Sequence, residues 1–507
     1  MLARYGGERI RKGMLHFLMG KGLSSIVSLI ILVLLVRHLK ITEFAAYSVL
    51  QAFVYVFTAL TGFGLLHITL RYIPELYTQH QGHALRVFML WTFGLRVVLL
   101  TSVALVAYSL GSQVASIFGL LDWIAVFQIY LVVVWLKVNN HFLFQIHEST
   151  LHQGPGQAVF LATTLLKLTL IVWLMEVGEL NLLNIVWVEL IAELVAMFAF
   201  CVSVIRIIQG SEVESNGIDF KVWWTENSRR VTKYGIAGYF QQLLIIPYGS
   251  APNRLVAGHF LGATSVAEFG FSQSFVDLIN RYLPAQLLGG LIRPVIVAKY
   301  SIKRDFSEVT RPLNFIFRLN TILLGLILAL ILSVGQQVVN FISNGNYGAE
   351  VALLLASMVC VLMLDSHRFM LDIAIHAIEK YDVLIVGNFI LASSLLLIVG
   401  LLPWCGTVAI PLAGSIGLLA SNSWIAHRLE KLGFNFSIGI FDFMRVLAIT
   451  LAAAGFGYLL SPITHWLVVI PLVSLAHLTL LWMTGAIRNE DWLALQHLKR
   501  IQSNQAT

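Results

Sequence analysis

Long apolar stretches are the feature of this sequence that most constrains its fold. About fourteen such stretches, bounded by charged or turn residues, each approach or exceed the roughly 20 residues that a helix needs to cross a bilayer. They lie near residues 16–36, 44–70, 88–110, 119–144, 156–176, 181–205, 233–252, 262–298, 313–342, 349–375, 382–403, 406–427, 441–460 and 463–485. We therefore expect an all-α polytopic membrane protein with about fourteen transmembrane helices. A break is expected in the overlong eighth stretch, at Pro284 and the Gly289–Gly290 pair.

The composition excludes the main alternatives. Charged residues make up 12% of the 507 residues and hydrophobic residues 58%, whereas a soluble protein carries about 25% charged residues. A globular chain of this length could not cover its surface with so few polar groups. Three cysteines are too few for a disulfide framework. Soluble, disordered and disulfide-rich classes are therefore excluded.

The basic residues predict the orientation in the membrane. The formal net charge is +7, and most Lys and Arg, Lys137 and Arg368 among them, are assigned to one side. The connections on the opposite side are nearly free of them: no Lys or Arg occurs in 111–118, 177–180, 343–348 and 404–406. Because positive charge stays cytoplasmic, both termini are expected inside, which agrees with an even number of spans. Arg37, Lys40 and Arg254 run against this pattern.

An internal repeat predicts two lobes. When the chain is compared with itself at one fixed offset, Gln51 matches Gln273, Arg71 matches Arg293 and Arg96 matches Arg318. The offset covers six helices, so the copies have the same orientation and are related by an axis along the membrane normal. The expected parts are an N-lobe of helices 1–6 (1–210), a cytoplasmic amphipathic linker (211–232), a C-lobe of helices 7–12 (233–430), and helices 13–14 with a cytoplasmic tail (431–507). Such lobes usually enclose a midplane cavity that opens alternately to each side, as in a transporter.

Three stretches carry a resemblance to a known family. They are Leu35–Ser48, Gly62–Glu75 and Asn253–Phe269. They resemble the polysaccharide-biosynthesis or O-antigen (Wzx-type) lipid-linked oligosaccharide flippases, which belong to the multidrug/oligosaccharidyl-lipid/polysaccharide exporter (MOP) superfamily. Members of that family often have Asp where Asn253 stands and Gly where Ala46 and Ala267 stand.

The resemblance implies a transporter and no enzyme. It implies that an undecaprenyl-diphosphate-linked oligosaccharide, such as a repeat unit of O-antigen lipopolysaccharide or exopolysaccharide, is flipped across the bacterial inner membrane by alternating access. Coupling to an ion or voltage gradient is expected, with membrane lipids, a polysaccharide polymerase and a chain-length regulator as candidate partners. The sequence contains no Walker A motif, dinucleotide fingerprint or HExxH, so ATP hydrolysis, a cofactor and a metal are not expected. The net positive charge is interpreted as membrane topology, so no nucleic-acid partner is expected.

Cations inside the predicted spans are candidates for a cavity that binds an anionic headgroup. Arg96 and Arg318 occupy equivalent repeat positions, and a guanidinium suits a diphosphate. Their alternative role is to reach lipid phosphates from a position near the helix end. The other candidates for this cationic cavity are Lys21, Arg71, Arg254 and Arg281.

Acidic residues inside the spans are candidates for coupling or gating. Asp277 and Arg281 are four residues apart, as a gating pair or a structural salt bridge would be. Lys167 could pair with Glu189 or Glu193 across adjacent helices, as a brace or as a proton site. Glu193 is the preferred acid for proton coupling.

Two further functions are weighed against a flippase. A cation-coupled multidrug or metabolite antiporter of the same superfamily would call for acids in the cavity, and the first helix offers Lys21 and no acid. A membrane-embedded glycan enzyme would need a large outer loop, which is not found. His141, His147 and His152 are expected in a cytoplasmic connection without metal-ligand spacing.

Overall fold

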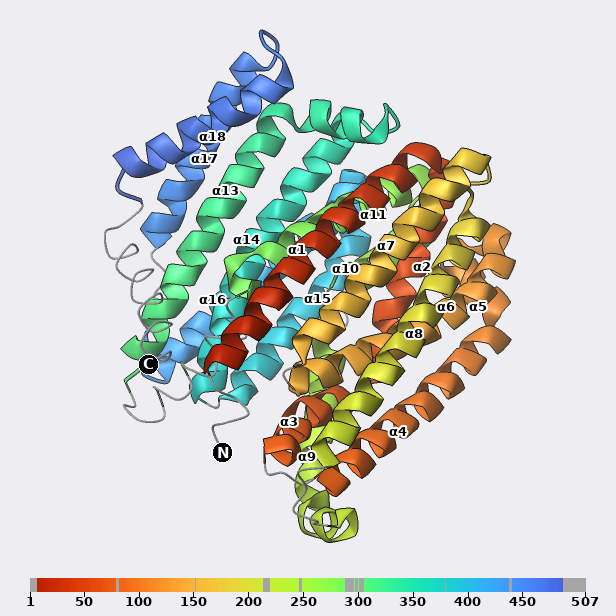
Figure 1. The fold of residues 1–507 in the computed structure, drawn as a ribbon. Coiled ribbons are helices and arrows are strands. Elements are labelled where there is room, and N and C mark those ends of the chain that lie inside the picture. The colour runs from red at the N-terminus through yellow and green to blue at the C-terminus, as the bar shows by residue number, and fades with distance from the viewer. Residues whose placement is uncertain are drawn as a thin grey trace. The chain divides into compact units, whose positions relative to one another are not determined.

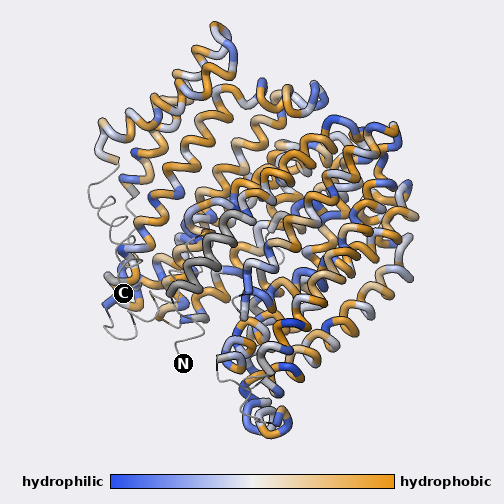
Figure 2. Tube along the Cα trace, in the orientation of Figure 1, coloured by the Kyte–Doolittle hydropathy of each residue, from blue (hydrophilic) through white to orange (hydrophobic). Residues whose placement is uncertain are grey.

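The computed structural model describes residues 7–78, 82–150, 152–212, 219–245, 249–287, 305–378, 380–436 and 440–486, together with 296 and 300. These residues form α-helices connected by turns and two short 3-10 helices (Figure 1). Among them, eleven helical stretches are long and apolar enough to cross a membrane, and one of these, 382–431, contains two helices. Figure 2 shows apolar residues along most of each long helix. The chain is therefore an all-α, multi-pass membrane protein, as the apolar stretches predicted.

The first of two compact units covers Met1–Ala267. Within it, α6 packs against α2, α3, α4, α7 and α8, so it lies at the centre of the unit. An apolar cluster from α3, α4, α6, α8 and α9 forms one part of its core. The helices are α1 (Gly7–His38), α2 (Ile41–Leu60), α3 (Leu65–Thr78), α4 (Gly82–Ser109), α5 (Gly111–Ile117), η1 (Leu121–Trp123), α6 (Ile124–Ser149), α7 (Gln153–Val177), α8 (Leu182–Glu212), α9 (Phe220–Ile245) and α10 (Ser250–Phe260).

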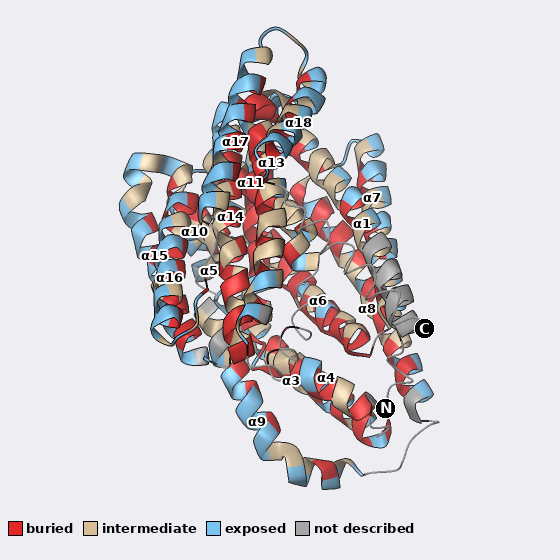
Figure 3. Ribbon diagram, turned by 90° about the vertical axis from the view of Figure 1, so that its left-hand side faces the viewer, coloured by how far each residue is buried: buried red, intermediate tan, exposed pale blue. Residues whose placement is uncertain are grey.

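The second unit begins at Glu268, inside α11. Its helix α13 packs against α14, α17 and α18, while α14, α15 and α16 pack against one another. The elements are α11 (Ala263–Tyr282), α13 (Ser307–Ser343), α14 (Ala349–Ile378), α15 (Tyr381–Cys405), η2 (Gly406–Val408), α16 (Ala409–Lys431), α17 (Ile440–Leu460) and α18 (Trp466–Met483). Large apolar side chains such as Leu396, Trp404 and Trp482 are exposed on these helices, as expected for surfaces in contact with lipid. Figure 3 shows exposed stretches along α15, α16 and α18.

Three predicted spans are interrupted. The stretch 44–70 is divided because α2 ends at Leu60 and the chain takes positive φ angles of 41° at Phe63 and 73° at Gly64 before α3 begins. The stretch 233–252 is divided between α9 and α10, and α9 also contains residues expected in the amphipathic linker. The break expected near Pro284 is present because α11 ends at Tyr282, whereas Gly289 and Gly290 lie outside the described residues.

The internal repeat is visible in the helix boundaries. Helix α2 covers residues 41–60 and α11 covers 263–282, so both ends are related by the offset that places Gln51 over Gln273. The preceding helices, α1 and α10, end at His38 and Phe260, which the same offset relates. The sequence offset inferred from a few matched residues therefore also relates helix α2 to α11 and the end of α1 to the end of α10.

Candidate functional site: buried charges in the two units

Glu189 on α8 is the centre of a buried polar network in unit 1. Its carboxylate accepts hydrogen bonds from the Tyr47 hydroxyl at 2.7 Å and from the Gln51 amide at 3.1 Å, both on α2. The Lys137 ammonium on α6 lies 2.8 Å from the other carboxylate oxygen. Lys137 also donates to the Tyr130 hydroxyl at 3.2 Å. The network thus connects α2, α6 and α8 inside the membrane region.

Glu193 makes a second ion pair one turn further along α8. Its carboxylate lies 2.6 Å from the Lys167 ammonium on α7 and accepts a hydrogen bond of 2.8 Å from the Asn140 amide on α6. The four-residue spacing of Glu189 and Glu193 places both acids on one face of α8. The expected pairing of Lys167 with one of these acids is therefore present, and each acid has a lysine of its own.

The assignment of Lys137 to the cytoplasmic side, made from the sequence, is wrong. Lys137 lies in the middle of α6, where Glu189 and Tyr130 satisfy its charge and its hydrogen-bonding groups. His141 and His147 are also inside α6, because this helix continues to Ser149, beyond its predicted end. His147 is buried, and its Nε2 lies 2.8 Å from the Ser203 hydroxyl on α8.

Arg96 on α4 is a buried cation without an anionic partner among the described residues. Its side chain is 2% exposed, and its guanidinium carbon lies 5.1 Å from the centre of the Phe142 ring on α6. The Nε atom makes no hydrogen bond. A cation–π contact compensates only part of the cost of removing an arginine from water. The site can therefore accept a negative charge.

Arg318, the repeat partner of Arg96, has different surroundings. Its guanidinium lies 3.8 Å from the Asp442 carboxylate on α17. The N-lobe has no counterpart of α17 in the predicted duplication, since helices 13 and 14 follow the second lobe. The two arginines are thus equivalent in sequence position and different in charge balance.

The remaining cation candidates are dispersed. Lys21 is half-buried on α1 and its charge acts on Glu148, whereas Arg71 is exposed on α3 at 3.9 Å from Glu75. Arg254, on α10, is 6% exposed and its charge acts on Tyr130 of the Glu189 network. Arg281 is exposed near the end of α11.

Asp277 is the remaining acidic candidate. Its carboxylate accepts a hydrogen bond of 2.9 Å from the Gln273 amide one turn earlier on α11. Gln273 is the repeat partner of Gln51, which likewise donates to a carboxylate, that of Glu189. Arg293, the repeat partner of Arg71, lies outside the described residues.

Arg368 on α14 is a buried arginine that the sequence assigned to the cytoplasmic side. Its guanidinium donates to the Ser421 hydroxyl on α16 at 2.6 Å and to the Asn388 amide oxygen on α15, and its Nε lies 2.9 Å from the Asp372 carboxylate. These partners come from three helices and make burial of the charge tolerable. Asp372 is four residues from Arg368 in the sequence, whereas Ser421 and Asn388 are distant from it and are uncharged residues that give no strong signal alone.

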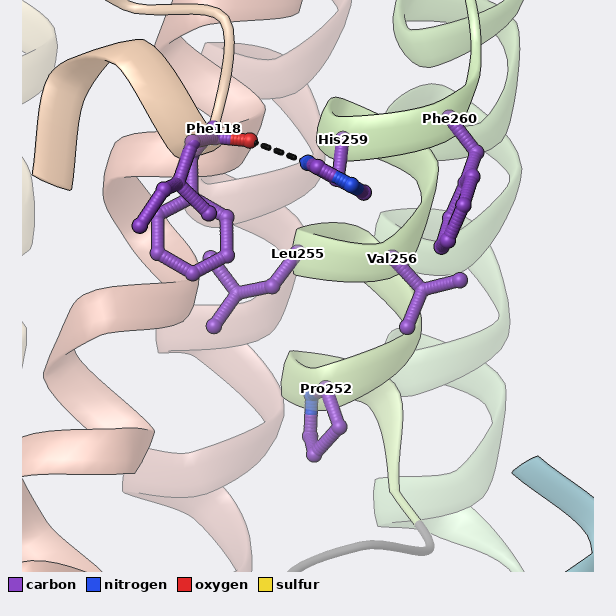
Figure 4. A pocket seen from close by; sticks show the side chains of 7 residues that line it. Phe118, Pro252, Leu255, Val256, His259 and Phe260 are labelled. Carbon is purple, nitrogen blue, oxygen red and sulfur yellow. Dashed lines mark hydrogen bonds between the residues drawn. The ribbon is translucent and has the colours of Figure 1, made fainter. Parts of the chain in front are cut away.

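A small cavity in unit 1 contains no comparable chemistry. It has a volume of about 290 Å³ and lies between the chain after α5 and α10 (Figure 4). Its lining residues are Ile117, Phe118, Pro252, Leu255, Val256, His259 and Phe260. The polar side chain among them, His259, donates to the Ile117 carbonyl at 2.6 Å. Among the described residues, no group of three or more His, Cys, Asp or Glu side chains could hold a metal ion.

Solved membrane transporters share this fold. The chain superimposes on a structure titled lipid II flippase MurJ, inward closed conformation, with a TM-score of 0.70 and 14% identity over 92% of this chain and 98% of that one. An inward-facing multidrug resistance MATE family transporter of the MOP superfamily gives a TM-score of 0.63 and 12% identity over 83% and 99%. The eukaryotic MATE transporter AtDTX14 gives 0.56 and 12% over 89% and 100%. The chain therefore shares the fold of these solved transporters.

The sequence comparisons add no closer relative. No protein-family model matches the chain. No curated protein sequence matches it either. The Wzx-type resemblance of the three stretches therefore remains an expectation.

Proposed function

We propose that this protein flips a polyprenyl-diphosphate-linked oligosaccharide across the bacterial inner membrane by alternating access, with an ion gradient or the membrane potential as driving force. The glycan and diphosphate need a hydrated, cationic path, because their transfer into hydrocarbon would cost on the order of tens of kcal/mol. The polyprenyl tail can stay in lipid. The proposal includes cytoplasmic termini, and a polysaccharide polymerase and chain-length regulator as partners.

Arg96 is the observation that supports an anionic cargo. The two lysines of the unit 1 network are each matched by an acid, whereas Arg96 has none among the described residues. A guanidinium can donate two parallel hydrogen bonds to a phosphate. Because Arg96 is covered in this conformation, it would meet the headgroup only when α4 and α6 separate or its side chain turns. That requirement fits a site that opens during the transport cycle.

The fold likeness supports a transporter and leaves two cargo classes to compare. One similar structure is titled a lipid II flippase, and others are titled multidrug resistance transporters. For a cationic drug, the cavity should offer carboxylates that are not already paired. In unit 1, Glu189 and Glu193 are both bound to lysines. Within unit 1, this charge balance favours the anionic, lipid-linked cargo. A multidrug antiporter is the alternative, and it would use a carboxyl group such as that of Asp365 in unit 2, which has no ion pair among the described residues.

The test is lipid analysis of a strain that lacks the gene. A polyprenyl-diphosphate oligosaccharide should accumulate on the cytoplasmic leaflet, and the wild-type gene should restore export. Arg96→Ala should reduce export by about tenfold or more, since one hydrogen bond to a charged group contributes about 1.5–3 kcal/mol. Export by Arg96→Lys should lie between that of the wild type and that of Arg96→Ala, because an ammonium keeps the positive charge but lacks the planar guanidinium.

Arg86→Ala is the matched control, because Arg86 is an exposed arginine on the same helix. It should export normally. Wild-type export by Arg96→Ala would remove the proposed role of Arg96. Unchanged surface glycan together with altered dye efflux in the deletion strain would favour the antiporter instead.

A further inference from the structure

A cluster on α14, in which Arg368 is buried, Asp365 is half-buried and the Asp372 side chain is 37% exposed, contains charges that do not balance. Asp365, Arg368 and Asp372 are three and four residues apart, so their side chains lie on one face of the helix. Asp365 lies close to the midpoint of α14, which begins at Ala349 and ends at Ile378. At a rise of about 1.5 Å per residue, each half of this helix is longer than half of the roughly 30 Å hydrocarbon core. Asp365 and Arg368 therefore lie in the central part of this span, and Asp372 lies about one turn beyond Arg368 toward the end of the helix.

Arg368 is committed to partners other than Asp365. Its three guanidinium nitrogens are used by Ser421, Asn388 and Asp372, and its side chain is 5% exposed. Asp372 is therefore the acid that is paired. Asp365 makes no hydrogen bond or ion pair within the described part of the chain, although the charges of Arg368 and Asp372 both act on it.

Among the described residues, the neighbouring helices bring one further cation to this level of unit 2: Arg318 on α13, whose guanidinium lies 3.8 Å from the Asp442 carboxylate. Helix α16 contributes Ser421 and Asn422, whose amide donates to the Leu364 carbonyl at 3.1 Å, and α15 contributes Asn388. Helix α13 contributes Asn320, bound to Ser366 at 3.1 Å. His367 on α14 packs at a tilt against Phe317 and stacks on Phe436. The remaining charged residues and histidines in the described parts of α13 to α16 lie near the helix ends: Glu308, Arg311, Glu350, His376, Asp382, His427, Arg428, Glu430 and Lys431.

Unit 1 shows what a balanced arrangement looks like. There, Glu189 and Glu193 each lie within 2.8 Å of a lysine nitrogen. In unit 2, the cluster has one carboxylate more than it has cations. A charged carboxylate in the membrane interior is costly, and a second carboxylate nearby adds to that cost. When one carboxylate takes up a proton, both the cost of burying its charge and its repulsion with the second carboxylate are removed.

We propose that Asp365 is a reversible proton-binding site, with Arg368 and Asp372 as the fixed ion pair beside it. The carboxylate takes one proton to become the neutral acid and returns it as the carboxylate, so no other reactant is needed. Use of this proton to drive transport rests on the proposed function. Proton binding itself does not.

The experiment is infrared difference spectroscopy of the purified full-length protein in lipid vesicles, between mildly alkaline and mildly acidic buffer. The wild type should show the carbonyl-stretch band of a protonated carboxylic acid. Asp365→Asn should lose that band, and Asp365→Glu should retain a band at a shifted frequency. Asp382→Asn, which removes an exposed acid in the first turn of α15, should leave the band unchanged.

Two results would overturn the proposal: absence of the band in the wild type, or its persistence in a folded Asp365→Asn protein. The unfolding midpoint of each variant in detergent establishes that it is folded. Whether the proton drives transport is tested by a separate experiment. If Asp365 drives transport, a pH gradient should accelerate export by the wild type and not by Asp365→Asn. Failure of the flippase proposal would leave the infrared result intact.

Discussion

At the scale of single residues, removing one partner of a lysine–glutamate pair in unit 1 should destabilise the protein strongly, whereas removing both partners should change its stability little. Lys137→Met should lower the free energy of unfolding by about 3–5 kcal/mol, because it leaves the Glu189 carboxylate buried without its cation. The double variant Lys137→Met/Glu189→Leu should recover most of that loss, since it leaves no unpaired charge. The measurement is the unfolding midpoint of the detergent-purified proteins.

An exposed ion pair provides the control for this prediction. Arg71 lies 3.9 Å from Glu75, and its side chain is 56% exposed. Arg71→Ala should therefore change the unfolding free energy by about 0–1 kcal/mol. Equal losses in the single and double Lys137 variants would contradict the interpretation, because they would mean that packing at these positions matters and the unpaired charge does not.

At the scale of elements, the break between α2 and α3 depends on a close contact with α9. A Cβ atom on Gly64 would lie 1.9 Å from the Gly235 carbonyl oxygen, and the φ angle of Gly64 is 73°. Gly64→Ala should therefore lower the unfolding free energy by about 2 kcal/mol or more, from backbone strain and from the forced displacement of α9. Thermal unfolding in detergent measures it.

Two other glycines distinguish the effect of backbone strain from that of the contact with α9. Gly178 has a similar φ of 77° with no atom within 4 Å of its added Cβ, so Gly178→Ala carries the strain alone. Gly94 lies inside α4, also with open space, and Gly94→Ala should leave stability unchanged or raise it by up to about 1 kcal/mol. If Gly64→Ala were no worse than Gly178→Ala, the contact with α9 would not be the constraint.

The elements also show how far the sequence alone leads. The apolar runs predict where the helices lie, because length and composition decide whether a segment can enter lipid. The interruption at Phe63 and Gly64 is missed, since it depends on Gly235, which is distant in the sequence. The charged clusters are found only in part. Lys167 and Glu193 lie on consecutive helices and are predicted to pair, whereas Lys137 pairs with an acid two helices further along the chain. Arg368 has a local partner in Asp372, but Ser421 and Asn388, which complete its burial, are distant in the sequence.

At the scale of the whole molecule, the helix order and the cytoplasmic basic residues predict an orientation that can be measured. Glu179 lies between α7 and α8 and Asn435 lies after α16, and both are exposed. With the N-terminus inside, counting α2–α3 and α9–α10 as single spans and α11 as one span puts Glu179 outside and Asn435 in the cytoplasm. The asymmetry of Lys and Arg predicts the same sides.

Cysteine labelling tests this orientation. In a chain whose natural Cys201, Cys360 and Cys405 are replaced by Ala, Glu179→Cys should react with a membrane-impermeant maleimide on intact spheroplasts. Asn435→Cys should react only after permeabilisation. The reverse labelling pattern would mean that the protein has the opposite orientation in the membrane. Labelling of both sites from outside would mean that the number of crossings between them is even, so that one interrupted helix does not cross the membrane. Because transport from the cytoplasmic leaflet needs Arg96 to be reached from that side, the orientation also decides whether the proposed route is open to its cargo.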